Sequence, residues 1–268
     1  MEKIEIFLKH IIKEAGNITL GYFGTKLEIT TKTSKSDVLT QADIATNDYI
    51  VSAIKKQFPD HGIISEEMDD YQTDAEYVWI IDPIDGTFNF STSVPIYAVL
   101  IALAKNGELI LAATYLPKFD ELLFAKKESG TFLNGVQVFV TQENELNHSS
   151  ATASGRIKPE YAGYSYFTHY LAKFNTLTLT LNSFSCLGYD HFLVATGRRD
   201  WTFHKGASLW DYAAGALLLQ EAGAKVTNLK GEPWSISDRE ILAANPVLHS
   251  ILLEHMKKSF EEYAHMKQ

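Results

Sequence analysis

The segment WDYAAGALLLQEAGA, from Trp210 to Ala224, constrains the fold more than any other part of the sequence. Small and apolar residues fill most of it, so a helix here is apolar on nearly every face and has to be buried. Gly223 provides its end. Asp211 stands at its start, so the helix directs an acid and the N–H groups of its first turn toward the interior or a cleft. A helix-capping role for Asp211 is the alternative interpretation.

Two short apolar segments also end in acids. GIISEE ends on Glu66 and Glu67, and YVWIID is followed by PIDG, which adds Asp85 to Asp82. Proline lacks an N–H group, so the strand is predicted to stop at Pro83, and the glycine after Asp85 permits a tight turn. Two like charges held on one turn require a cation between them. Turn-capping aspartates and a surface glutamate pair are the alternatives.

These acids favour a hard divalent cation. Glu66, Asp82, Asp85 and Asp211 offer oxygen ligands, which Mg²⁺ and Ca²⁺ prefer, and Mg²⁺ commonly combines few carboxylates with a substrate phosphate. Cys186 is the only cysteine, so neither an intrachain disulfide nor a cysteine-based zinc site can form. We interpret Cys186 as a buried structural thiol and Mg²⁺ as the cation.

Composition and pattern exclude several classes. The formal net charge is −9, which disfavours broad attraction to a nucleic acid polymer or an anionic membrane. The first residues predict an amphipathic helix from Ile4 to Phe23 rather than a signal peptide. The longest apolar run, Val94 to Ala104, is too short to span a bilayer. The glycine motifs of dinucleotide-binding, P-loop and serine-hydrolase enzymes do not occur. We therefore expect a cytoplasmic protein.

Helices and strands alternate along the chain. A second helix is predicted from Ala42 to Phe58, with Ile44 on its apolar face, and Asn106-Gly107, Ser129-Gly130 and Asn134-Gly135 predict turns between strands. The most polar stretch, 141–150, predicts a boundary between two lobes. Residues 1–145 would form an α+β lobe with most of the acids, and residues 146–268 an α/β lobe that supplies Asp211.

The segment DPIDGTFNF resembles a motif of the inositol monophosphatase family. The resemblance includes SEE before this segment and the W-D, AAG and EAG elements after it. The segment KTSKSDVLTQAD, residues 32–43, also resembles a loop of that family, and the match spans nearly the whole chain. The resemblance implies a layered α-β-α-β-α sandwich of the inositol monophosphatase and fructose-1,6-bisphosphatase type. It further implies a Mg²⁺-dependent, lithium-sensitive phosphoric monoester hydrolase that acts on a small phosphate ester and forms a homodimer.

The resemblance also implies roles for individual residues. Glu66, Asp82 and the carbonyl of Ile84 would bind a first Mg²⁺, and Asp82, Asp85 and Asp211 a second. The N–H groups of Gly86 and Thr87 would hold the phosphate, while Thr87 and Glu66 would orient and deprotonate the attacking water. Lys32, Asp43 and Glu67 would support the site or lie near a third metal; surface exposure is the alternative for Lys32.

The departures from the family concern the leaving group, for which the resemblance implies a pocket in the second of the two lobes. Inositol-hydrolysing members carry a glutamate where this chain has His204, and small residues where it has Tyr189 and Asp190. His204 would contact the substrate or lie at a lobe edge. Asp190 would bind a hydroxyl or an amine or pair with Arg198 or Arg199. Inositol 1-phosphate, fructose-1,6-bisphosphate, 3′-phosphoadenosine 5′-phosphate, NADP and histidinol phosphate stay open as substrates. A non-catalytic binding protein of the same fold is the alternative from a different class.

Overall fold

The computed structural model describes residues 1–27, 29–31, 38–153, 162–172 and 180–266. Its α-helices are α1 (Glu2–Tyr22), α2 (Gln41–Gln57), α3 (Thr87–Ser91), α4 (Ala162–Ala172), α5 (Leu187–Ala195), α6 (Leu209–Glu221) and α7 (Pro246–Met266). The first strands are β1 (Ile29–Thr31), β2 (Val38–Thr40), β3 (Gly62–Ser65), β4 (Tyr77–Asp85), β5 (Ala98–Lys105), β6 (Glu108–Leu116), β7 (Glu121–Lys126), β8 (Gly130–Leu133) and β9 (Val136–Val138). The later strands are β10 (Ser150–Thr152), β11 (Thr180–Asn182), β12 (Trp201–Lys205), β13 (Lys225–Thr227) and β14 (Glu240–Ala244).

Two large sheets organise the molecule. The first has seven strands in the order β3 to β9, with β3 and β4 parallel and the other neighbours antiparallel. The second has five strands in the order β11-β10-β12-β14-β13. The first sheet is built from residues 62–138 and the second from residues 150–244, so the polar stretch at 141–150 lies between them along the chain.

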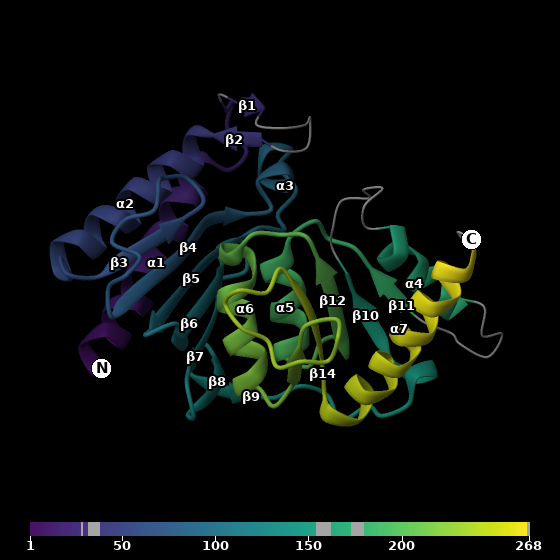
Figure 1. Cartoon of the computed structure of the whole chain (residues 1–268). Coiled ribbons are helices and arrows are strands. Elements are labelled where there is room, and N and C mark those ends of the chain that lie inside the picture. The colour runs from purple at the N-terminus through teal and green to yellow at the C-terminus, as the bar shows by residue number, and fades with distance from the viewer. Residues whose placement is uncertain (28, 32–37, 154–161, 173–179, 267–268) are drawn as a thin grey trace.

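The sheets and helices form five layers (Figure 1). Helices α1 and α2 cover one face of the seven-stranded sheet, and α5 and α6 fill the space between its other face and the five-stranded sheet. Helices α4 and α7 cover the outer face of the second sheet. This arrangement confirms the layered α-β-α-β-α sandwich predicted from the sequence.

Helix α6 occupies the centre of the sandwich, as its composition predicts. Its residues from Tyr212 to Leu219 are all buried, and they pack between both sheets in the largest core cluster. One prediction for α2 is wrong: Ile44 is 48% exposed, because the face of α2 that meets the sheet carries Ile50 and Ile54 instead. No helix within the described ranges is both long enough and apolar enough to cross a membrane.

Candidate metal centre

The end of β4 carries two of the predicted ligands. Asp82 pairs with Leu100 and Asp85 with Ala98, with a bulge between them, so the ladder resumes after Pro83 instead of stopping as the sequence predicts. The bulge accommodates the missing N–H of proline, and Asp82 Oδ1 accepts a hydrogen bond from Ile84 N at 3.1 Å. The bulge re-aims both aspartates at the end of one buried strand.

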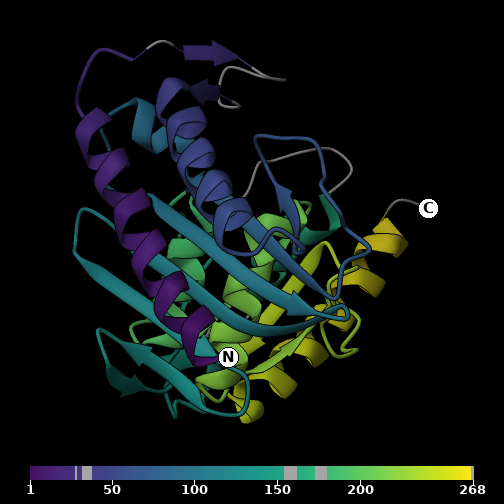
Figure 2. The same ribbon diagram turned by 90° about the vertical axis from the view of Figure 1, so that its left-hand side faces the viewer.

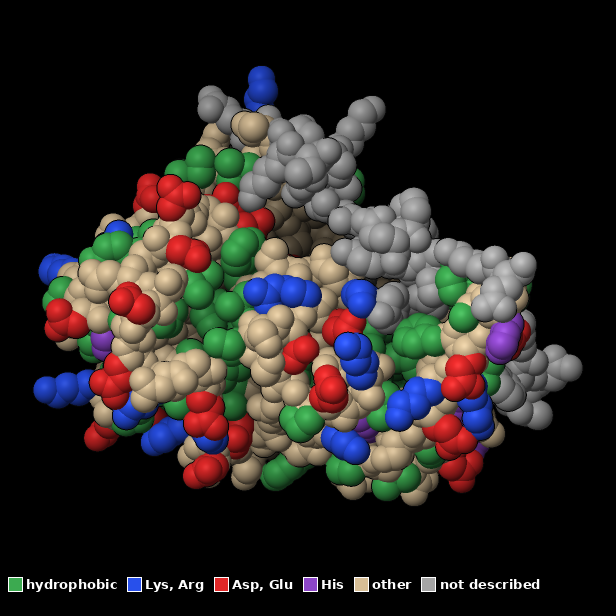
Figure 3. Space-filling view, viewed as in Figure 1, with side chains coloured by type: hydrophobic (Ala, Val, Ile, Leu, Met, Phe, Trp, Pro, Cys, Tyr) green, Lys and Arg blue, Asp and Glu red, His purple; other side chains and the backbone are tan. Residues whose placement is uncertain are grey.

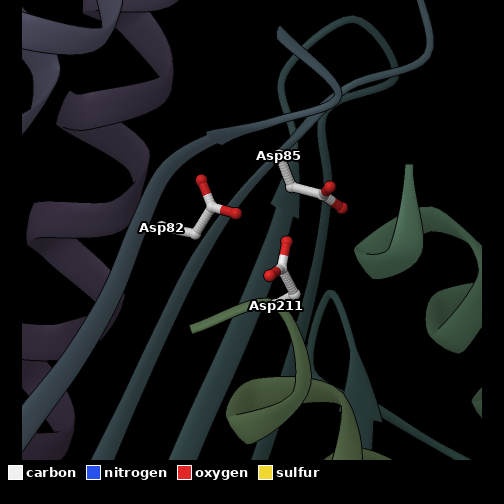
Figure 4. A group of neighbouring side chains, drawn as sticks. All are labelled: Asp82, Asp85 and Asp211. Atoms are coloured by element: carbon white, nitrogen blue, oxygen red, sulfur yellow. The ribbon is translucent and has the colours of Figure 1, made fainter. Parts of the chain in front are cut away.

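Asp211 approaches from the start of α6. It occupies the third position of a capping box with Ser208, whose N–H donates to Asp211 Oδ2 at 2.7 Å. Asp211 therefore caps α6 and also lies close to the other two acids. One carboxylate oxygen from each of Asp82, Asp85 and Asp211 lies within 4.8 Å of the others, and Figure 4 shows the three side chains converging from β4 and α6. We call these three residues the carboxylate centre.

Electrostatics in the carboxylate centre disfavour ionisation unless a cation is present. Burial raises the pKa of Asp82 well above its usual value, and the charges of Glu66, Asp85 and Asp211 raise it further. Burial likewise raises the pKa of Asp211 and brings the pKa of Asp85 to about 6. No Lys or Arg of the described residues forms an ion pair with these acids. Buried, mutually repelling oxygen ligands are what a hard divalent cation stabilises, so the residues fit a Mg²⁺ site.

Glu66 and Glu67 follow β3 and are half-buried. The charge of Glu66 raises the pKa of all three acids in the carboxylate centre, which places this carboxylate within electrostatic range of them. The charges of Glu67 and Glu66 both raise the pKa of Asp43. Both glutamates therefore act on Asp43, and Glu66 acts in addition on the carboxylate centre.

Thr87 connects the turn after β4 to α2. Its hydroxyl lies 2.8 Å from Ile84 O, to which it donates, and 3.2 Å from Asp43 Oδ1. Asp43 also caps α2, because its Oδ2 accepts hydrogen bonds from the N–H and hydroxyl of Thr40. Burial raises the pKa of Asp43 to about 7. Asp43 thus holds the threonine predicted to act in catalysis.

Gly86 has a φ of +86°, which a residue with a side chain rarely adopts. A Cβ atom at this position would lie 3.1 Å from both Cys186 Cβ and Ile96 O. Only glycine fits this turn without strain, so the backbone at 86–87 stays accessible beside the aspartates.

The sequence did not predict how Asp85 is held. Gly188 N and Leu187 N, at the start of α5, donate to its carboxylate, and Cys186 Sγ lies 3.2 Å from Asp85 Oδ2. Cys186 is buried, as predicted, and burial raises the pKa of its thiol well above the usual value, so it stays protonated and donates. The helix start and the thiol together fix one oxygen of a predicted metal ligand.

The three predicted substrate residues lie in different surroundings. Tyr189 is half-buried, with its ring 5.1 Å from that of Phe184. Asp190 is fully buried and accepts a hydrogen bond from Thr152. His204 is half-buried, and its Nδ1 lies 2.6 Å from the hydroxyl of Tyr212.

The two arginines suggested as partners of Asp190 make other contacts: Arg198 pairs with Glu121, and Arg199 contacts Asn182. Lys32 lies outside the described residues. The substrate roles of Tyr189, Asp190 and His204 stay predictions.

On the face of the molecule drawn in Figure 3, basic and acidic side chains are interspersed rather than gathered by sign. This distribution agrees with the net charge of −9 and with the absence of a basic stripe in the sequence.

Comparison with known proteins agrees with the fold and the motifs. The model of the inositol monophosphatase family matches residues 1–263. A fructose-1,6-bisphosphatase/inositol-1-monophosphatase of Aquifex aeolicus is 33% identical over 250 residues, or 92% of each chain. A putative Nus factor SuhB of Neisseria meningitidis is 34% identical over 220 residues, which cover 82% of this chain and 84% of the relative.

The solved structures agree as well. The crystal structure of the extragenic suppressor protein SuhB of Bartonella henselae superposes with a TM-score of 0.90 at 27% identity, over 96% of this chain and 99% of that one. With a family match over nearly the whole chain, this protein belongs to the inositol monophosphatase family, whose members are phosphoric monoester hydrolases.

Proposed function

We propose that this protein is a Mg²⁺-dependent phosphatase that hydrolyses a small sugar or polyol phosphate, with inositol 1-phosphate as the first candidate. The carboxylate centre is the single observation that carries the proposal. Two buried acids and one half-buried acid, whose ligand atoms lie within 4.8 Å of one another and to which no Lys or Arg of the described residues is paired, are unstable in their ionised forms without a bound cation.

Asp82, Asp85 and Asp211 would hold one Mg²⁺, and Glu66 and the carbonyl of Ile84 would join Asp82 at a second. When bound, Mg²⁺ supplies charge neutralisation and polarisation at the phosphoryl oxygens. The number of ions, two or three, is part of the proposal. Gly188 and Cys186 fix one oxygen of Asp85, which leaves its other oxygen for the cation.

Gly86 and Thr87 would bind the phosphate through backbone N–H groups, because the turn carries no side chain at 86 and the N–H groups that open a helix lack partners within it. Thr87 donates its hydroxyl proton to Ile84 O, so its oxygen lone pair can accept a hydrogen bond from the attacking water. Glu66 would take the proton of that water. Asp43 and Glu67 would support this arrangement from α2 and the end of β3.

A panel of phosphate esters tests the proposal. We expect Mg²⁺-dependent phosphate release from at least one of inositol 1-phosphate, fructose-1,6-bisphosphate, 3′-phosphoadenosine 5′-phosphate, NADP and histidinol phosphate, and inhibition by lithium. Tyr189, Asp190 and His204 would select among them. Asp70→Asn, which removes an exposed acid in the loop after β3, is the matched control for Asp82→Asn and should leave turnover unchanged. Metal binding without release from any ester would overturn the proposal in favour of the non-catalytic alternative.

The proposal includes a homodimer in the cytoplasm. Sedimentation velocity should then give twice the chain mass of 30.1 kDa, and a species at the mass of one chain would contradict it.

A further inference from the structure

The two faces of the seven-stranded sheet are covered unequally. On one face α6 packs across β4 to β8. On the other face α1 contacts β5 and β6, and α2 contacts β4, so neither helix reaches far over β7 and β8. In Figure 2 the teal strands at this edge of the sheet extend past α1. Leu122 and Phe124 of β7 are buried in the core cluster that α1 helps to form, so the less covered part of this face lies over β8.

A cavity of about 760 Å³ occupies this position, between α1 and the turns that flank β8. Its floor is aromatic, because Phe124 and Phe132 are directly paired across β7 and β8 and both line it, together with Leu122. The turn at Gly135 leaves open space, since a Cβ atom there would meet nothing within 4 Å. The volume lies within the roughly 300–1,000 Å³ that small-molecule sites occupy.

The rim of the cavity is basic. Lys9, His10, Lys13 and Lys126 line it with only two acids, Glu5 and Asp120, although the whole chain carries a net charge of −9.

The two acids are already engaged by lysines. Lys9 Nζ lies 2.8 Å from Glu5 and 3.9 Å from the centre of the Phe124 ring. Lys13 Nζ lies 3.9 Å from Asp120. Neither Lys126 nor His10 makes an ion pair with any described residue, so the cavity retains a lysine with no anion opposite it.

We propose that this cavity binds a small organic anion that carries a flat apolar ring. The ring would lie against Phe132, because Phe124 is only 5% exposed and Lys9 already lies over its ring, and the anionic group would lie beside Lys126 and His10. Stacking on aromatic rings and charge-assisted hydrogen bonds to lysine are the interactions that such surroundings supply. None of the acids of the carboxylate centre lines this cavity, so the site is separate from the proposed phosphatase site and does not depend on it.

The fluorescent anion 1-anilinonaphthalene-8-sulfonate, titrated into the folded protein, tests the inference because it combines aromatic rings with one negative charge. We expect saturable binding, weakened about 10-fold by Lys126→Glu, as expected for loss of a charge-assisted contact. Ser129→Trp, which fills the cavity from its exposed edge, should weaken it as well. Lys127→Glu is the matched control: Lys127 is the next residue, pairs with Glu108, lies outside the cavity, and should leave affinity unchanged.

Several outcomes would overturn the site. Affinity that is equal in Lys126→Glu and in the unmodified protein would remove the cavity as the binding place. Displacement of the probe by inorganic phosphate in the presence of Mg²⁺, or loss of binding in Asp82→Asn, would place the probe at the carboxylate centre. Affinity that falls as protein concentration rises would show that a second copy of the chain covers the groove instead.

Discussion

Two regions of buried titratable groups meet at the start of α6, and burial acts on them in opposite directions. Asp211 belongs to the carboxylate centre, where burial raises the pKa of the acids. Tyr212, the next residue, belongs to a histidine region. There burial lowers the pKa of His191 to about 3 and that of His204 to about 4.

The difference lies in how each region tolerates its polar groups. His204 stays neutral and bonds to the hydroxyl of Tyr212, which in turn donates to Arg239 O. His191 is accommodated by Gly215 of α6, where a Cβ atom would lie 1.9 Å from its Nδ1. The carboxylates have mainly other acids as charged neighbours, so they stay ionised together only beside an added cation. Desolvation therefore favours the neutral form of the histidines, which packing accommodates, whereas the ionised carboxylates require a ligand.

Asp82→Asn gives the largest expected effect on this contrast. We expect Mg²⁺-dependent turnover to fall to background, because the residue contributes to both proposed metal positions. The metal-free variant should melt at a higher temperature than the metal-free parent, since the repulsion with Glu66, Asp85 and Asp211 is relieved. Mg²⁺ should raise the melting temperature of the parent much more than that of the variant. Turnover in Asp82→Asn, or equal stabilisation by Mg²⁺, would contradict the assignment.

Thr87→Ala should lower kcat by about 100-fold, within the range for loss of a group that assists proton transfer. Its hydroxyl contacts Ile84 O and Asp43 and is not itself a proposed metal ligand, so Mg²⁺ affinity measured by calorimetry should change little. Thr87→Ser keeps the hydroxyl and should recover most of the activity. Unchanged kcat in the alanine variant would remove Thr87 from water activation.

Cys186→Ala should weaken Mg²⁺ binding by about 10-fold. This is the lower end of the range of affinity loss that follows removal of a group that orients a metal ligand. The thiol contacts Asp85 Oδ2 at 3.2 Å, and serine places a hydroxyl donor at the same position. Cys186→Ser should therefore bind Mg²⁺ nearly as well as the parent in the same calorimetric titration. Equal weakening in both variants would indicate a packing role for sulfur rather than a hydrogen bond to Asp85.

The smallest expected effect concerns pH in the histidine region. Because the pKa of His191 is depressed in the folded state, the unfolded chain takes up a proton first as pH falls below about 6.5. Titration of His191 therefore leaves stability unchanged above that pH and lowers it increasingly as pH falls toward its folded value. Urea unfolding at pH 7.5 and 5.5 should show a smaller loss of stability for His191→Leu than for the parent.

His148→Leu, at an exposed histidine, is the control and should follow the parent. An identical loss of stability in His191→Leu and the parent would show that His191 does not contribute to the pH response.

Much of the carboxylate centre could be predicted because its signals are local. Asp82 and Asp85 stand at a strand end next to a proline and a glycine, and Asp211 stands at the start of a helix too apolar to be exposed. The same helix predicted a buried central element, and the motifs around these acids predicted the layered fold. The exposed Ile44 and the continued strand after Pro83 could not be predicted locally, because each depends on which neighbouring element supplies the contact.

The sequence by itself thus determined the acids and their order along the chain. Only the tertiary structure decided that Cys186 and Gly188 reach Asp85 across more than 100 positions of sequence, and that β7 and β8 extend past α1 to leave a basic cavity. The physical reason is the distance along the sequence over which the deciding interactions act. Strand ends, turns and helix starts are set by neighbouring residues, whereas the meeting of α5 with β4 depends on how two sheets pack around α6.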